Sequence, residues 1–398
     1  MKTLLLILVV TTGLYGATID ELLDAALSEN PSLEAIEAKI AASRETVDLA
    51  GNFDNPVMGL AVNAIRPGDI SNRSAERMQS TAISISQRIP FFGKRDQKVA
   101  AAEAKTEQLD HRLDGARALL AATVRGEAYA LWSLRKTLQL EEETAALLRH
   151  NAELFQGYST TDATSHMGIM TAELALSNSA MVQESLREAL TTRRARLAYL
   201  CGLTVETLEF DPGTPVLPDM HALRERLGAN FALKASDAAI QEKRASHAYE
   251  ALQRYSDPTL QVGFFQREGF EDYVSLSLSF ALPVYGNEAA KVQIAQARLL
   301  EEEYGRSDLK RRLESDFDAT AARLLGSYER YSILSNESLP KLEHMFELAS
   351  ASVGTGEDLE RYVGLIERKL KLEKERIAAI AEFYTALATL NALTGVTR

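Results

Sequence analysis

The chain has 398 residues, of which 46% are hydrophobic and 25% charged, with 44 basic against 56 acidic side chains. This composition is typical of a folded protein, and a net charge of −12 without a basic tract excludes the electrostatics of nucleic-acid binding. A single cysteine cannot form an internal disulfide, and six scattered histidines lack the spacing of a structural zinc site.

Residues 1–16 have the features of a secretory signal peptide. Lys2 gives a positive start, residues 4–10 are apolar, and residues 11–16 end in the small residue Gly16 before Ala17. A single membrane-anchor helix is the alternative, but it needs about 20 apolar residues, and acidic side chains begin already at Asp20. We expect cleavage after Gly16. The later sequence has no apolar stretch of about 18 residues, so any membrane-spanning part would have to consist of strands.

Two stretches of the sequence alternate apolar residues with small or polar ones. Met58 and Leu60 alternate with Gly59 in the first, and Leu276 and Leu278 alternate with serines in the second. This period of two predicts β-hairpins with one apolar and one wet face. Four strands of about 8–11 residues can cross a membrane, yet a closed barrel needs at least about eight strands. We therefore expect other copies of the chain to complete the sheet, with twelve strands and twelve helices from three chains.

Residues 93–202 contain no proline and are rich in good helix formers. One helix over about 109 residues would extend roughly 160 Å, so a turn near the middle is expected. Turn-forming residues occur at 157–162 and, in the second half of the chain, at 353–358. Pro340 should kink or break the helix that contains it. Trp132 and Cys201 are expected to be packing residues of the helices.

The chain repeats one plan twice. A Pro-aromatic-Gly junction ends the segment Ile-Pro-Phe-Phe-Gly at 89–93, and Leu-Pro-Val-Tyr-Gly follows 193 residues later at 282–286. Each junction is followed after 109 residues by a Leu-x-Gly ending, at Gly202 and Gly395. The equal offset and span indicate an internal duplication. The predicted parts are a signal peptide (1–16), a first repeat (17–210) with a β-hairpin at about 56–88 and a helical hairpin at about 93–202, and a second repeat (211–398) with a β-hairpin at about 258–282 and a helical hairpin at about 286–395.

These features resemble the TolC family of outer-membrane channel proteins. The resemblance rests on residues 19–33 (Ile-Asp-Glu-Leu-Leu-Asp-Ala-Ala-Leu-Ser-Glu-Asn-Pro-Ser-Leu), on the two junctions and on Ser-Val-Gly-Thr at 352–355. It implies a mostly α-helical fold with a small β part, in which long helical hairpins form a trimeric α-barrel continuous with a 12-stranded transmembrane β-barrel, four strands per chain. It also implies an exit duct of a tripartite efflux pump or type I secretion system, in the outer membrane and extending into the periplasm. The implied partners are two further copies in a homotrimer, a periplasmic adaptor, an inner-membrane transporter and outer-membrane lipid, with no catalytic residue, cofactor or metal.

The resemblance places a periplasmic gate on the final helix, just beyond the second turn. Acids there, tripled by symmetry, would form an electronegative constriction held shut by pairs to Arg361. The alternative is that acids in a first helical turn complement the helix macrodipole. The gate candidates are Asp358, Glu360, Glu357, Arg361 and Tyr362. The hairpin tips expected to contact the adaptor are at Thr161, Asp162, Gly354, Thr355 and Gly356.

Other interpretations stay open at this point. His166, Met167 and Met170 would suit a soft metal ion, although methionines at helical spacing also fill gaps between helices. A periplasmic coiled-coil adaptor, or a structural protein of an envelope complex, would also contain long helices, but an adaptor carries one helical hairpin between compact β domains. An enzyme is not indicated, because the sequence has no phosphate loop, dinucleotide-binding glycine turn or His-Glu-x-x-His motif.

Overall fold

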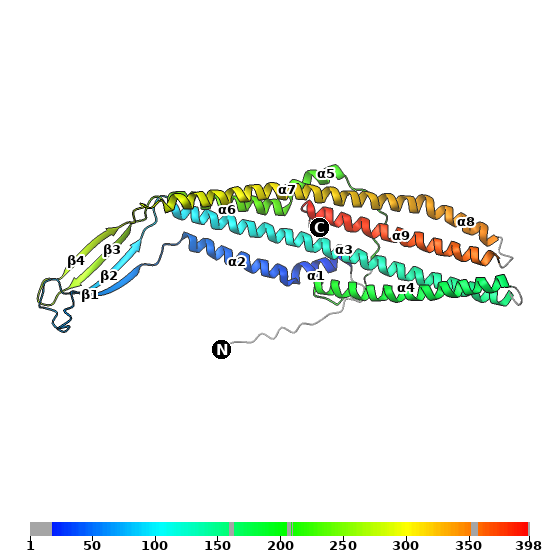
Figure 1. Cartoon of the computed structure of the whole chain (residues 1–398), viewed down its shortest axis with the longest axis horizontal. Coiled ribbons are helices and arrows are strands. Elements are labelled where there is room, and N and C mark those ends of the chain that lie inside the picture. Colours follow the sequence, from blue (N-terminus) through cyan, green and yellow to red (C-terminus); the bar gives the residue numbers. More distant parts are fainter. Residues whose placement is uncertain (1–17, 159–162, 205–207, 209, 352–356, 397–398) are drawn as a thin grey trace. The chain divides into compact units, whose positions relative to one another are not determined.

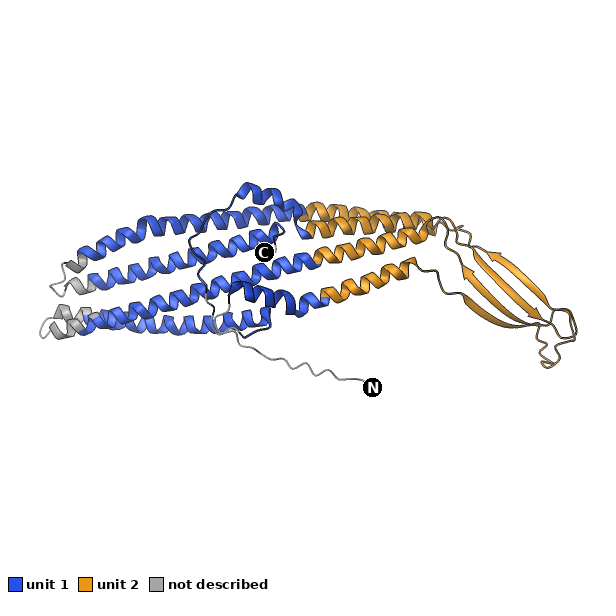
Figure 2. Cartoon of the chain, turned by 180° about the vertical axis from the view of Figure 1, so that it is seen from behind, with its two compact units in different colours: residues 1–35, 113–231, 310–398 blue, residues 36–112, 232–309 orange. Residues whose placement is uncertain are grey.

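A computed structural model describes residues 18–158, 163–204, 208, 210–351 and 357–396. The chain forms two compact units, coloured separately in Figure 2. One comprises residues 1–35, 113–231 and 310–398, and the other comprises residues 36–112 and 232–309. Each unit therefore takes segments from both halves of the sequence. The signal-peptide prediction and the hairpin tips at 161–162 and 354–356 lie outside the described residues.

The second unit contains a four-stranded antiparallel sheet (Figure 1). Its strands are β1 (Val57–Asn63), β2 (Ser80–Arg88), β3 (Thr259–Gln266) and β4 (Tyr273–Ser279), in the spatial order β1-β2-β3-β4. The register places Met58 opposite Ile85, Ile85 opposite Val262, and Val262 opposite Leu276. Because side chains alternate along a strand, one face of the sheet collects the apolar residues of all four strands. The four strands form two β-hairpins, β1-β2 and β3-β4, which pair side by side through β2 and β3.

Helices flank this sheet in the sequence. The unit contains most of α2 (Pro31–Gly51), the first part of α3 (Lys94–Tyr158), nearly all of α6 (Phe231–Leu252) and the first part of α7 (Asn287–Ile333). The hydroxyl groups of Ser43 and Thr106 hydrogen-bond at 2.8 Å and join α2 to α3. An ion pair of 3.1 Å between Arg244 and Glu303 joins α6 to α7, which run alongside each other in Figure 1.

Each strand-to-helix junction turns at a glycine in the left-handed region. Gly93 and Gly286 both have φ of +74°, and α3 and α7 begin at the next residue. An L-residue is strained in this conformation, whereas glycine adopts it freely. The sequence repeat is therefore a repeat of backbone geometry.

The first unit is helical. It contains α1 (Ile19–Glu29), the remainder of α3 and α7, α4 (Ala163–Cys201), α5 (Met220–Glu225), a 3₁₀ turn (Arg226–Ala229), α8 (Leu339–Ala351) and α9 (Glu357–Leu393). Thr18 caps α1 reciprocally with Glu21. Leucine, alanine and β-branched side chains of α3, α4 and α9 form a packed cluster, in which alanines allow close approach of the helices. Its buried members are Leu148, Ala152, Ala172, Ala175, Val363 and Ile366.

Both helical hairpins end against an asparagine. The Asn30 side-chain amide donates to the carbonyl oxygen of Leu200 at 3.0 Å, and that of Asn230 donates to the carbonyl oxygen of Leu393 at 2.8 Å. The glycines two residues after these carbonyl groups have φ of +70° and +75°, as expected at a helix C-terminus. The matching Leu-x-Gly endings thus carry matching contacts.

Pro340 coincides with an interruption of the helix, as expected. A π-helical turn (Leu334–Ser338) separates α7 from α8, and Pro340 is the second residue of α8. Proline lacks the N–H group that would continue the α-helical ladder, so a local change of helix type is the physical response. Trp132 and Cys201 are buried, which confirms them as packing residues. Across the described ranges, no helix combines the length and the apolarity needed to cross a membrane.

Candidate functional site

One face of the sheet exposes its apolar side chains. Leu60 and Leu276 are 76% and 71% exposed, and every large apolar residue of this face is exposed by more than a third. Water does not stabilise a continuous apolar surface of this kind, whereas lipid or another protein surface does. The members of the face are Met58, Leu60, Val62, Ile83, Ile85, Leu260, Val262, Phe264, Val274, Leu276 and Leu278.

The opposite face of the sheet carries mainly small and polar residues, apart from Val57 and the stacked rings of Phe265 and Tyr273. One row across the strands consists of Gly59, Ser84, Gly263 and Ser275, and the next contains Ser86, Gln261 and Ser277. Hydroxyl and amide groups on this face can hydrogen-bond to water, and short side chains leave space in front of it. The sheet therefore fits a wall with lipid on one side and water on the other.

The two outer strands of the sheet are open at their edges. Within the described chain, β1 pairs only with β2, and β4 pairs only with β3. Each edge presents backbone N–H and C=O groups that lipid cannot satisfy, at a cost of several kcal/mol for each unpaired group. A sheet of this composition needs a further strand at both edges before it can sit in a membrane.

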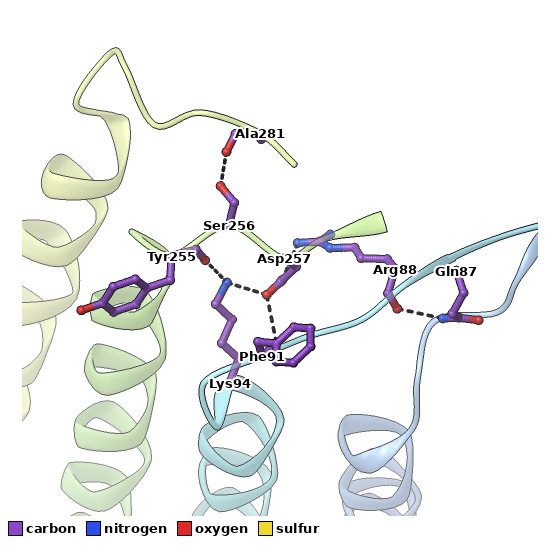
Figure 3. Close-up of polar contacts among 8 residues, drawn as sticks. All are labelled: Gln87, Arg88, Phe91, Lys94, Tyr255, Ser256, Asp257 and Ala281. Carbon is purple, nitrogen blue, oxygen red and sulfur yellow. Dashed lines mark hydrogen bonds and ion pairs between the residues drawn. The ribbon is translucent and has the colours of Figure 1, made fainter. Parts of the chain in front are cut away.

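A buried ion pair lies where the strands meet the helices (Figure 3). Lys94 Nζ, at the first residue of α3, lies 2.7 Å from Asp257 Oδ1, two residues before β3, and also contacts the carbonyl oxygen of Tyr255. The two charged side chains are only 3% and 4% exposed. Arg88 Nη2 donates to Asp257 Oδ2 at 3.0 Å, and the backbone N–H of Phe91 donates to Oδ1 at 3.3 Å. Asp257 thus joins the end of β2 and the start of α3 to the beginning of β3.

The acidity of Asp257 follows from these contacts. Burial by itself favours the protonated carboxyl group and raises its pKa. The hydrogen bonds from Lys94, Phe91 and Arg88 and the charge of Lys94 outweigh burial, so the pKa of Asp257 is below its ordinary value. The carboxylate is therefore ionised, and the site is a salt bridge at neutral pH.

An aromatic contact accompanies this ion pair. The rings of Phe92 and Tyr255 lie with their centroids 4.8 Å apart. Phe92 has φ of +63°, an uncommon conformation for a residue other than glycine. The tilted contact with Tyr255 stabilises the ring in this position and contributes about 0.5–1.5 kcal/mol beyond the burial of its surface.

The predicted gate region begins with the first turn of α9. Glu357 is the first residue of α9, so Glu357, Asp358 and Glu360 occupy its first turn, and their side chains lie outside the described part. Arg361 is exposed, and Tyr362 packs on Phe346 of α8 with ring centroids 4.8 Å apart. Tyr362 is therefore a contact between the two helices of the second hairpin. The pairing of Arg361 with the acids remains a prediction.

Two buried carboxylates hold the helical unit together. The Glu141 side chain, 2% exposed, forms an ion pair with Lys374 of α9 and accepts a hydrogen bond of 2.8 Å from Ser179 of α4. The Glu127 carboxylate lies 2.8 Å from both Arg193 and Arg196 of α4. Sequence reasoning missed these groups and the pair at Asp257. The available signal was an acidic residue among the apolar positions of a helix, where burial requires a cationic partner.

The described residues give no geometric support for a soft-metal site at His166, Met167 and Met170. Met170 is 56% exposed, and the side chains of His166 and Met167 lie outside the described part of the chain. The cluster therefore stays a prediction from sequence.

Comparison with known proteins shows what the sequence and the fold of this chain are similar to. Residues 22–203 match the family described as Outer membrane efflux protein. Comparison with curated proteins finds no match. Among solved structures, the fold is similar to VceC from Vibrio cholerae at 15% identity, with 96% of this chain and 97% of that chain covered and a TM-score of 0.78. It is also similar to CusC at 12% identity, with 95% and 92% covered and a TM-score of 0.79.

A third structure, the open state of the MtrE outer membrane channel of Neisseria gonorrhoeae, is 14% identical, with 96% of this chain and 90% of that chain covered and a TM-score of 0.74. These likenesses show the fold over nearly the whole chain, including the second half. The predicted TolC-like fold is confirmed. The chain thus has the fold of solved outer-membrane channels over nearly its whole length, and residues 22–203 match the outer membrane efflux protein family.

Proposed function

We propose that the chain is the exit duct of a tripartite efflux pump or type I secretion system and works as a passive homotrimeric channel. The observation that carries the proposal is the four-stranded sheet with an exposed apolar face, a small polar face and two open edges. Three copies supply twelve strands, which is within the range of closed transmembrane barrels. Closure pairs both edges, turns the apolar face to lipid and leaves the serines and glycines around a water-filled lumen.

The helical hairpins form the periplasmic part of the duct in this proposal. A periplasmic adaptor binds their tips, around Thr161, Asp162 and residues 354–356, and an inner-membrane transporter supplies the energy. The duct itself moves substrates by diffusion through a wide, wet lumen. Its selectivity is therefore low, and the transporter determines the exported substrate.

The oligomer and the channel can be tested on purified protein. Light scattering in detergent should give the mass of three chains, and the protein in a planar bilayer should conduct ions. Heat-denatured protein serves as the control in both assays. A folded chain that is monomeric in buffer without detergent would contradict the duct and favour a periplasmic adaptor.

We place the gate at the acidic residues in the first turn of α9. Replacing Asp358 and Glu360 with alanine removes six carboxylates from a trimer, and single-channel conductance should rise or block by multivalent cations should weaken. Glu367→Ala is the matched control, because Glu367 is an exposed acid farther along the same helix. Equal conductance of the double variant, the control and the wild-type protein would remove these acids from the gate.

A further inference from the structure

The boundary between β2 and β3 joins the two repeats within one chain. We call it the internal seam and include in it the junction residues at the ends of these strands. It contains the buried pair of Lys94 and Asp257, the tilted ring contact of Phe92 and Tyr255, and a 3.0 Å hydrogen bond from the Ile89 N–H group to the carbonyl oxygen of Pro258. The residues that the first repeat contributes to the internal seam follow β2 in the sequence, and those that the second repeat contributes precede β3.

The duplication gives every residue of the internal seam a counterpart at a free edge. Residues that follow β2 have counterparts 193 positions later, after β4, as Pro90 and Pro283 show. Residues that precede β3 have counterparts 202 positions earlier, before β1, as Pro56 and Pro258 show. A second copy of the chain placed beside β4 would therefore repeat the internal seam as a seam between copies.

The counterparts of the two aromatic residues are also aromatic. Phe92 corresponds to Tyr285, and Tyr255 corresponds to Phe53. Tyr285 is 88% exposed, against 61% for Phe92, and Phe53 is 55% exposed, against 40% for Tyr255. The guanidinium group of Arg95 lies 4.3 Å from the centroid of the Phe53 ring, on one side of it. Two large aromatic residues thus stand exposed at opposite edges, at the positions where a neighbouring copy would bring them together.

The counterparts of Lys94 and Asp257 are amides, and the counterpart of Arg88, the other cation that contacts Asp257, is Ala281. Lys94 corresponds to Asn287, and Asp257 corresponds to Asn55. Both asparagines are exposed in the single chain, whereas the internal pair is almost completely buried. An unpaired lysine or aspartate waiting at a sheet edge would be costly to move out of water, while an amide costs less and can donate to or accept from its partner. An amide pair therefore suits a contact that forms only on assembly.

We propose that β4 of one copy pairs with β1 of the next in the register of the internal seam. In this register Leu278 lies opposite Leu60, and Ser277 lies opposite Ala61 of the next copy. Tyr285 stacks on Phe53, and Asn287 meets Asn55 of that copy. The inference rests on the proposed trimer and assigns its contacts.

The polarity of the strands agrees with this register. It places apolar Leu276 and Leu278 opposite apolar Val62 and Leu60, and serines opposite small residues. A shift of one residue would set leucines against the small polar face, which the wall of the barrel excludes. A shift of two residues preserves the faces but misaligns the aromatic pair and the asparagines. The experiment must therefore distinguish registers that differ by two.

Cysteine pairs can make this distinction. Ala61 corresponds to Gly263 of the internal seam, and Ser277 corresponds to Ser84. A Cβ atom added at Gly263 would lie 3.5 Å from Cβ of Ser84, and this distance suits a disulfide. Trimers with Ala61→Cys and Ser277→Cys should therefore cross-link on oxidation into covalent trimers on a non-reducing gel. The matched control is Ala61→Cys with Ser275→Cys, whose diagonal separation of about 7–8 Å is too long. The native Cys201 is buried, so it should not take part in the cross-linking.

The outcomes separate the inference from the proposed function. A trimer in which only the in-register pair cross-links supports the register. A trimer in which the offset pair cross-links better, or in which neither pair does, overturns the register while the duct stands. A chain that light scattering shows to be monomeric in detergent overturns the duct itself.

Transfer of the internal ion pair provides an independent test. Asn287→Lys or Asn55→Asp alone should lower the temperature at which the trimer dissociates, because each adds a charge without a partner. The two together should raise that temperature above the value expected from the sum of the single effects. Additive effects of the two substitutions would show that these residues do not meet.

Discussion

The buried ion pair at the strand-to-helix junction gives the sharpest prediction about stability. Asp257→Asn removes the negative charge that pairs with Lys94 and Arg88, and it leaves a lysine that is 3% exposed without a counter-charge. Breaking a buried pair at one end costs about 3–5 kcal/mol, so we expect the free energy of unfolding to fall by about 3 kcal/mol or more per chain. Lys94→Met should cost less, because Asp257 keeps two of its donors.

A double-mutant cycle isolates the pair. The double variant K94M/D257N should lose less stability than the two single losses combined, with a coupling of about 1–3 kcal/mol. The measurement is urea unfolding followed by circular dichroism in detergent at one protein concentration, because association shifts apparent stability. The control is Glu303→Gln, which breaks the exposed pair with Arg244 and should cost at most about 1 kcal/mol. Equal losses for D257N and E303Q, or no coupling, would refute the burial argument.

The same pair should respond to acid in a defined direction. The pKa of Asp257 is lowered in the folded chain, and an unfolded aspartate has a pKa of about 3.9. Its contribution to stability is therefore complete above about pH 4 and is lost as the pH falls through the folded pKa. The stability difference between the wild type and D257N should be constant from about pH 5 to 8 and shrink below about pH 4. A difference that instead grows on acidification would contradict the assignment.

Three further predictions test other parts of the molecule. Leu276→Arg should reduce the amount of heat-modifiable trimer in outer membranes, because an arginine that faces lipid in the middle of a strand costs about 2–4 kcal/mol per copy. The control is Ser277→Arg, the next residue, which lies on the opposite, wet face and should assemble normally. Equal trimer yields of the two variants would contradict the assignment of the two faces to lipid and water. Lys374→Met should lower the unfolding free energy by about 3–5 kcal/mol, because it leaves Glu141 buried and unpaired, and Glu141→Gln in the same chain should restore part of the loss. Burial raises the pKa of Cys201 to about 11, so iodoacetamide at pH 8 should label the thiol only on unfolding, and rapid labelling of the folded chain would disagree.

The features that sequence predicts here are local or periodic. The alternation through Leu276 and Leu278 is visible in the chain, and the strand that it predicts is β4. Gly93 and Gly286 follow prolines at matching positions, and both adopt the left-handed backbone that such a junction requires. Backbone conformation and face polarity depend on near neighbours, so one sequence is enough to predict them.

The features that sequence did not predict depend on distant partners. Lys94 and Asp257 are 163 residues apart, and Glu141 and Lys374 are 233 residues apart. Nothing in the neighbourhood of either member shows which opposite charge it meets, because tertiary packing selects the partner. The division into two compact units that mix both repeats is a consequence of the same long-range packing.

The position of these ion pairs bears on the order of assembly. Both join the first repeat to the second within one chain, Lys94 to Asp257 and Glu141 to Lys374. The cost of removing these charges from water is therefore met while a single chain folds, because both partners are already present. The free edges carry apolar, aromatic and amide groups, whose burial on association leaves no charge unpaired. Substitutions at the ion pairs should accordingly reduce the amount of folded chain, whereas substitutions at Tyr285 or Asn55 should weaken the trimer and leave the fold of each chain unchanged.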